Sequence, residues 1–169
     1  MDEASFRRVA GSFATGVSVV TTSLDGMLHG ITVASLTSVS LAPLLLLVCI
    51  DKKACAHDQI DRAGRFGVSL LAFDQEAVSR TFATAGQPEE GRLRGIPFRT
   101  GTHGLPILGG ALAHFECELA SRCDGGDHTI FVARVLGGAV DREAPPLVHF
   151  RGAYGTFQPT PPGGKPPSW

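Results

Sequence analysis

Apolar residues recur with a helical period near the start of the chain. Phe6, Val9, Ala10 and Phe13 follow the spacing of one helix face, which predicts a short amphipathic helix ending near residues 15–16. Two further short helices are predicted, one over residues 51–61 with Asp51 as its cap and one that begins after Asp74.

Most of the chain shows strand patterns instead. Residues 44–50 are apolar on both faces, which is typical of a central strand, whereas residues 112–119 alternate and place His114, Glu116 and Glu118 on a solvent-facing side. The turn signals at residues 24–26 and 124–127 predict hairpins. The predicted strands cover residues 17–23, 27–34, 36–40, 44–50, 65–72, 112–119, 128–140 and a last region within 147–157.

Composition agrees with a turn-rich, mainly β fold. The 169 residues include 21 Gly and 11 Pro, and no regular alternation of strands and helices is present. We therefore expect an α+β chain dominated by an antiparallel β-barrel with short flanking helices. Residues 1–157 form one domain in this interpretation, and residues 158–169 are a disordered tail because they are rich in Pro and Gly.

Charge excludes several classes of partner. The 15 Lys and Arg residues balance 16 Asp and Glu without a long block of one sign, which argues against nucleic acid and against an anionic membrane surface. The longest apolar run, residues 44–50, is far shorter than the roughly 20 residues of a membrane-spanning helix. The first residues do not resemble a secretory signal, so we expect a cytoplasmic protein.

The four cysteines favour neither a metal site nor disulfides. Cys49 and Cys55, and likewise Cys117 and Cys123, are separated by five residues, unlike the closely spaced pairs of zinc ribbons. Cys49 and Cys117 are interpreted as small apolar strand residues. Dinucleotide-binding Gly-rich, P-loop, nucleophile-elbow and metalloprotease motifs are all absent, and we expect no metal.

Three clusters have candidate chemistry. Residues 32–40 carry five hydroxyl side chains between two strands, where they suit either a ligand or a Ser/Thr turn. Lys52 and Lys53 follow a buried strand at a predicted helix start, which suits a phosphate, although a solvated lysine pair is the alternative. Residues 125–128, Gly-Gly-Asp-His, are either an approach site for a second molecule or a simple hairpin turn.

Four segments in order along the chain carry a resemblance that places these clusters in context. They are Thr-Gly-Val-x-Val-Val-Thr-Thr at 15–22, Gly-Ile-Thr-Val-Ala-Ser-Leu-Thr-Ser-Val-Ser at 30–40, Gly-Gly-Ala-Leu-Ala-x-Phe-Glu-Cys at 109–117 and Gly-Asp-His-x-Ile at 126–130. Over about residues 5–157 the chain resembles the flavin reductase-like family. The resemblance implies an FMN-binding split barrel, usually a homodimer.

The family resemblance also implies site residues. It implies flavin contacts at Thr32, Val33, Ala34, Ser35, Ser38, Val39 and Ser40. It implies a phosphate region at Cys49, Ile50, Asp51, Lys53 and Ala54, and a less specific phosphate or dimer contact at Arg151. Asp127 and His128 are implied to position the nicotinamide and not to act as an acid and a base.

The implied activity is hydride transfer from NADH or NADPH to FMN or FAD, with reduced flavin passing to a partner monooxygenase. An FMN carrier or sensor without turnover is the alternative from another class, and a pyridoxamine-phosphate-oxidase-like enzyme is disfavoured by the low net charge. Residues 92–97, Arg-Leu-Arg-Gly-Ile-Pro, depart from the family's usual R-F-x-G-V-x-W pattern. The sequence does not choose between FMN and FAD, between NADH and NADPH, or among oxygenase partners.

Overall fold

The computed structural model describes residues 1–84 and 95–159. Its helices are α1 (Glu3–Ala10), α2 (Cys55–Ala63) and α3 (Glu76–Ala83). Its strands are β1 (Thr15–Gly16), β2 (Ser18–Leu24), β3 (Met27–Val33), β4 (Thr37–Leu41), β5 (Leu44–Asp51), β6 (Arg65–Leu70), β7 (Phe98–Thr100), β8 (Pro106–Leu108), β9 (Ala113–Gly125), β10 (His128–Val140), β11 (Leu147–Phe150) and β12 (Ala153–Thr156). The predicted mainly antiparallel β fold with short helices is confirmed.

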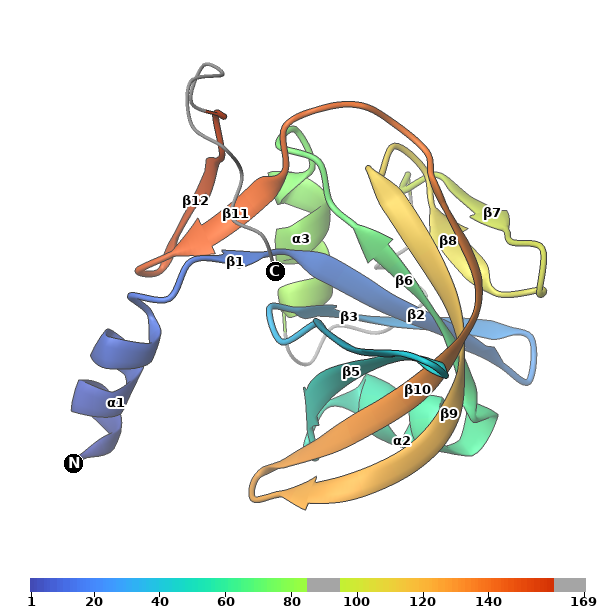
Figure 1. The fold of residues 1–169 in the computed structure, drawn as a ribbon, viewed down its shortest axis with the longest axis horizontal. Coiled ribbons are helices and arrows are strands. Elements are labelled where there is room, and N and C mark those ends of the chain that lie inside the picture. Colours follow the sequence, from blue (N-terminus) through green and yellow to red (C-terminus); the bar gives the residue numbers. More distant parts are fainter. Residues whose placement is uncertain (85–94, 160–169) are drawn as a thin grey trace.

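A seven-stranded antiparallel sheet in the order β3-β2-β6-β9-β10-β5-β4 forms the body of the molecule (Figure 1). Smaller sheets, β1-β11-β12 and β7-β8, lie beside it. The end of β3, at one edge of the large sheet, and the end of β5, near the other edge, line a common hollow. The sheet therefore curls on itself, and this curling brings sequence-distant strand ends together.

The main core lies between the inner face of this sheet and α2. Phe66, Phe131 and Ile60 of α2 are fully buried there. A second cluster packs α3, through Phe82, against Val19 and the segments that flank β8 and β11. Burial of each such side chain contributes about 1.5–3 kcal/mol, so these two clusters fix both helices on the barrel.

Several boundary predictions were wrong for identifiable reasons. Helix α1 ends at Ala10, not near residues 15–16, because Gly11 closes it and Thr15–Gly16 pairs as β1 with β11. Asp51 is the last residue of β5, and Ala54 occupies the cap position of α2. Gln75 occupies the cap position of α3, while Asp74 instead binds Arg142 through two hydrogen bonds of 3.1 and 2.8 Å.

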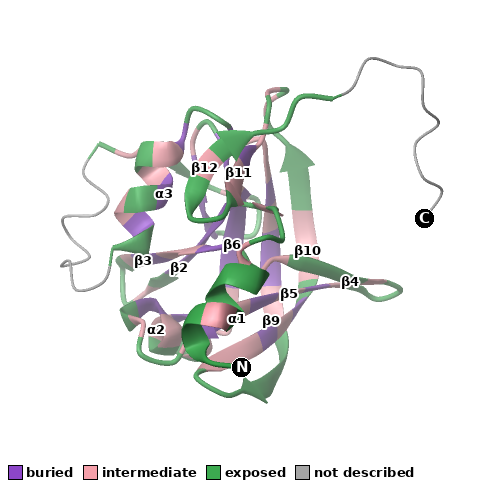
Figure 2. Ribbon diagram, turned by 90° about the vertical axis from the view of Figure 1, so that its left-hand side faces the viewer, coloured by how far each residue is buried: buried purple, intermediate pink, exposed green. Residues whose placement is uncertain are grey.

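Two predictions about burial also fail. Residues 44–50 form β5, which is not central but next to the edge strand β4, and its second face is half-buried. On the polar side of β9, His114 and Glu116 are not solvent-facing, because they are buried beneath the segment 99–105. Glu118, whose side chain is 42% exposed, does reach solvent as predicted. Toward the β9–β10 turn, in contrast, β9 is exposed from residue 120 onward, while the facing part of β10 is half-buried or buried (Figure 2).

Residues 85–94 lie outside the described residues, as does the part of the predicted disordered tail 158–169 that begins at residue 160. Of the unusual segment 92–97, only residues 95–97 are described. Cys49 and Cys117 lie on β5 and β9, as expected for strand residues. Within the described ranges, no helix is long and apolar enough to span a membrane.

Candidate functional site

A hollow of about 440 Å³, which we term the ring hollow, forms where three strand ends meet. Its walls come from the end of β3 with the loop that follows, from the end of β5, and from the first residue of β10. The lining residues are Ile31, Thr32, Val33, Ala34, Ser35, Cys49, Ile50, Asp51 and His128. Eight of these nine belong to the predicted site, and only Ile31 was missed.

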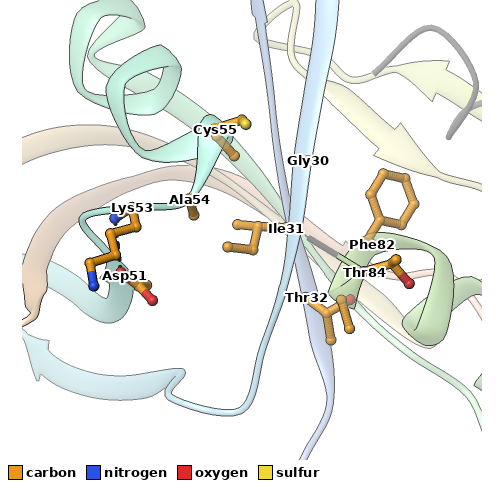
Figure 3. Close-up of a pocket in the computed structure, with 11 residues that line it drawn as sticks. Gly30, Ile31, Thr32, Asp51, Lys53, Ala54, Cys55, Phe82 and Thr84 are labelled. Atoms are coloured by element: carbon orange, nitrogen blue, oxygen red, sulfur yellow. Dashed lines mark hydrogen bonds between the residues drawn. The ribbon is translucent and has the colours of Figure 1, made fainter. Parts of the chain in front are cut away.

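A second hollow of about 290 Å³, the phosphate hollow, adjoins the first and shares Ile31, Thr32 and Asp51 with it. Lys53, Ala54 and the first two residues of α2 line one side, and Gly30 with the end of α3 lines the other. Figure 3 shows Asp51 and Lys53 facing Phe82 and Thr84 across this space, with β3 between them.

The hydroxyl groups of the ring hollow support its walls. Thr32 Oγ1 donates to the Ser79 carbonyl at 2.8 Å, which ties β3 to α3. Ser35 Oγ accepts from the Cys49 amide at 2.9 Å and donates to the Cys49 carbonyl at 3.0 Å, which ties the loop to β5. Within residues 1–84 and 95–159, the structure shows no hydrogen bond from the amides of Ala34 and Ser35. These amides are available as neutral donors to a ligand.

The two lysines after β5 have different roles. Lys52 Nζ donates to the Gly126 carbonyl at 2.6 Å and to the Asp124 carboxylate, both in the β9–β10 hairpin. Lys53 Nζ makes no hydrogen bond or ion pair within the described ranges, and Lys53 lines the phosphate hollow. Its amide donates to Asp51 Oδ1 at 2.8 Å, which fixes the turn between β5 and α2.

Helix α2 begins beside Lys53 without a side-chain cap. Its cap residue is Ala54, and Cys55 and Ala56 of its first turn line the phosphate hollow. The N–H groups and the dipole at such a helix start favour an anion. Helix α2 thus begins about one turn later than predicted from Asp51 as its cap. Its start still offers N–H groups to the phosphate hollow.

Asp127 and His128 lie where the β9–β10 hairpin meets the end of β5. His128 pairs with Asp51 in the strand register, and its Nδ1 lies 2.7 Å from Asp127 Oδ1. This hydrogen bond, followed by the imidazole charge and by the charge of Lys53, lowers the pKa of the Asp127 carboxyl. The carboxylate lies against Nδ1 of the imidazole, and His128 lines the ring hollow.

Four predicted site residues lie elsewhere in the chain. Ser38, Val39 and Ser40 are on β4; Ser38 and Ser40 line a separate, leucine-rich hollow, and Ser40 Oγ accepts from the Ala42 amide at 3.2 Å as in a turn. Arg151 is in the β11–β12 turn, where its guanidinium lies 5.0 Å from the Phe150 ring. Within one chain, these four residues line neither the ring hollow nor the phosphate hollow.

Sequence reasoning missed the wall that α3 contributes. A Cβ on Gly30 would lie 2.7 Å from a ring carbon of Phe82, so only glycine lets α3 approach β3 this closely. A lone glycine within a β-branched strand was the available signal. It predicts a close approach but not which element approaches.

Comparison with known proteins identifies the family. Residues 10–158 match the model of the flavin reductase like domain. The chain belongs to the flavin reductase-like family. It is 36% identical over 159 residues to the reductase component of the 4-nitrophenol 4-monooxygenase/4-nitrocatechol 2-monooxygenase of Rhodococcus opacus, covering 94% of this chain and 83% of that one.

Two other members are informative. The FMN reductase (NADH) SmoA of Agrobacterium fabrum is 38% identical over 153 residues, with 90% of this chain and 85% of that one covered. The solved NADH:FAD oxidoreductase SgcE6 of Streptomyces globisporus C-1027, in complex with NAD and FAD fragments, has a TM-score of 0.86 and 36% identity, with 94% of each chain covered. The fold of this flavin reductase-like chain is thus the split barrel of its family.

The two hollows present groups that fit a flavin. The ring hollow combines apolar walls with neutral backbone donors, as a flat heterocycle with ring nitrogens and carbonyls requires. The phosphate hollow presents Lys53 and the start of α2, as a phosphate requires.

Proposed function

We propose that this protein is an NAD(P)H:flavin oxidoreductase, which reduces FMN or FAD and supplies reduced flavin to a partner oxygenase. The observation that carries the proposal is the meeting of residues 31–35, residues 49–51 and His128 around one hollow. These segments are far apart in the chain, and each belongs to a different strand end. The names of the relatives, reductase components and NADH-dependent reductases, support the same activity.

A bound flavin would supply the redox chemistry, accepting a hydride from the nicotinamide and carrying both electrons. The protein's share is binding and orientation. The amides of Ala34 and Ser35 would hold the polar edge of the ring, and Lys53 with the start of α2 would hold the phosphate. His128, oriented by Asp127, would position the nicotinamide over the ring hollow.

Release of the product is consistent with this site. Among the described residues that line the two hollows, Lys53 is the one side chain with a permanent positive charge. The remaining groups are the Asp51 carboxylate, the His128 imidazole, two thiols, hydroxyls, backbone amides and apolar side chains. A single permanent positive charge favours modest affinity for a phosphate-bearing ligand. A reductase that serves a separate oxygenase needs flavin to leave after reduction, and we place this protein in the cytoplasm with such a partner.

The test measures oxidation of NADH and of NADPH by the purified protein with free FMN and with free FAD. Turnover with any of the four combinations supports the proposal and assigns both cofactor preferences. His128→Ala should raise the nicotinamide KM by about tenfold while changing the flavin KM little, because the lost contact is to the nicotinamide. Flavin binding without oxidation of either nucleotide would instead indicate the carrier or sensor.

We also propose that the protein is a homodimer. Helix α1 has no buried residue, and Phe6 and Val9 are 62% and 61% exposed. An eight-residue helix is only marginally stable alone in water, so it needs a surface to pack on. In Figure 1, α1 lies apart from the large sheet. We propose that a second copy of the chain provides the surface on which α1 packs.

A further inference from the structure

The β9–β10 hairpin that carries Asp127 and His128 extends past α2 at its outer end (Figure 1). From residue 120 to its turn, every residue of β9 is exposed, whereas β10 is held from His128 onward by its pairing with β5 and by the buried Phe131. The hydrophobic core therefore holds β10 but not the turn at residues 124–127. The turn includes two adjacent glycines, and Gly126 has a φ of +79°. Because glycine has no side chain to restrict its backbone, the position of the turn depends on other contacts.

Lys52 makes three hydrogen bonds to this hairpin. Its amide donates to the Asp127 carbonyl at 3.0 Å, and its ammonium donates to the Gly126 carbonyl and to the Asp124 carboxylate. The ammonium also lowers the pKa of the Asp124 carboxyl, by hydrogen bonding first and by charge second. Three residues of the turn, 124, 126 and 127, are therefore tied to one residue at the end of β5.

Lys52 also joins the two halves of the proposed site. It lies between Asp51, which lines both hollows and pairs with His128, and Lys53, which lines the phosphate hollow. A second contact connects α2 to β10 near this point: His57 Nε2 lies 2.8 Å from Thr129 Oγ1. A movement of the turn away from β5 would displace Asp127 and so change how His128 is oriented.

We propose that Lys52 is a positioning residue: it holds the turn at residues 124–127 beside the end of β5 and so sets how Asp127 orients His128 at the ring hollow. This inference rests on the proposed function. Lys52 would affect nicotinamide binding through His128 and would not contact the nicotinamide itself. The side chain of Lys52 is 42% exposed and that of Asp124 is 80% exposed. An ion pair so exposed contributes little to global stability, so its removal should alter geometry more than folding.

The test compares Lys52→Met with Lys53→Met in steady-state kinetics. Lys52→Met should raise the nicotinamide KM about fivefold or more and leave the flavin KM within about twofold, because misplacement affects His128. Lys53→Met should instead raise the flavin KM and leave the nicotinamide KM nearly unchanged. Lys52→Arg, which keeps a charged donor, should recover most of the wild-type nicotinamide KM.

Arg134→Met serves as the matched control. Arg134 forms an exposed ion pair with Glu118 across the same two strands, at 2.6 Å and away from the turn. Loss of that cation should leave both KM values unchanged. If Arg134→Met raises the nicotinamide KM as much as Lys52→Met does, general loss of charge or of strand pairing explains the effect and the proposal is wrong.

A measurement without ligand separates this inference from the proposed function. Amide hydrogen exchange over residues 124–130 should accelerate in Lys52→Met and not in Lys53→Met, with the melting temperature of both variants near that of the wild type. Unchanged exchange together with an unchanged nicotinamide KM would overturn the role of Lys52 while leaving a reductase that responds to His128→Ala. Absence of any turnover in the wild-type protein would instead overturn the proposed function.

Discussion

Two adjacent lysines at the end of β5 show how residues of one type diverge in role. Lys52 is bound to the β9–β10 turn, whereas Lys53 lines the phosphate hollow beside the start of α2. The sequence pattern groups them as one cationic pair. The β-turn that follows Asp51 separates them, since successive side chains there point to different elements.

Lys53→Met should weaken binding of FMN by about tenfold and binding of riboflavin, which has no phosphate, by less than about twofold, because a charged hydrogen bond to the phosphate is lost. Fluorescence titration of the two flavins measures this directly. An equal loss for both flavins would show that Lys53 supports the ring and not the phosphate.

The cysteines should differ in reactivity according to their surroundings. Burial, followed by the charge of Glu116, raises the pKa of the Cys117 thiol to about 12, so it stays protonated and unreactive in neutral and mildly basic solution. Cys55 and Cys123 are exposed. Iodoacetamide at about pH 8 should therefore label Cys55 and Cys123 in the native protein and spare Cys117, as peptide mass spectrometry would detect. Early labelling of Cys117 would contradict its burial.

At the scale of elements, the sequence predicts where strands and helices occur better than what covers them. The hairpin at residues 124–127 and the short link between β3 and β4 follow from turn chemistry and periodicity. The burial of Glu116 does not, because its Oε2 accepts from the amides of His103 and Leu105, 13 and 11 residues away. A polar residue on an alternating strand looks solvent-facing until the segment that covers it is known.

The same limit applies to the site. The residues at strand ends were predicted because the family motifs are contiguous there, whereas the α3 wall depends on how Phe82 packs against Gly30. Ser38, Val39 and Ser40 continue the motif in sequence, but β4 carries them past the ring hollow to the sheet edge. Contiguity in the sequence does not ensure contact with one pocket.

A link between elements gives a pH-dependent prediction. Asp74, before α3, binds Arg142 after β10, and the hydrogen bond and charge of Arg142 lower the pKa of the Asp74 carboxyl below its ordinary value of 3.8. A carboxyl with a lowered folded-state pKa stabilises the fold above that ordinary value and loses this contribution as the pH falls through the lower folded-state pKa.

Asp74→Asn should therefore be less stable than the wild type at pH 7, and the difference should shrink as the pH falls below 3.8, the ordinary pKa of the carboxyl. Urea unfolding at several pH values measures the two free energies of unfolding. A difference that stays constant down to pH 2 would mean that the Asp74 charge is not the source of the stabilisation.

At the scale of the whole molecule, α1 is the element least explained by one chain. None of its residues is buried in the described chain, although its N-terminus is capped by Asp2, which accepts from the Ser5 amide at 2.7 Å. A capped amphipathic helix with an exposed apolar face is suited to an interface.

Replacement of Phe6 and Val9 by Gln should shift the protein from dimer toward monomer, since both side chains lose apolar contact with the second copy. Analytical ultracentrifugation over a range of concentrations measures the shift, and replacement of the exposed Met27 by Gln is the control. Equal sedimentation of wild type and α1 variant would exclude α1 from the interface.

The central claim is that this chain reduces flavin and releases it. It is tested most directly by an anaerobic titration in which NADH or NADPH is added to the protein with a large excess of free FMN or FAD, while the absorbance of oxidised flavin is followed. We expect at least one of the two nucleotides to bleach all of the flavin, which amounts to many equivalents of flavin for each subunit. Bleaching that stops at or below one equivalent per subunit would contradict it and would indicate a protein that retains its flavin.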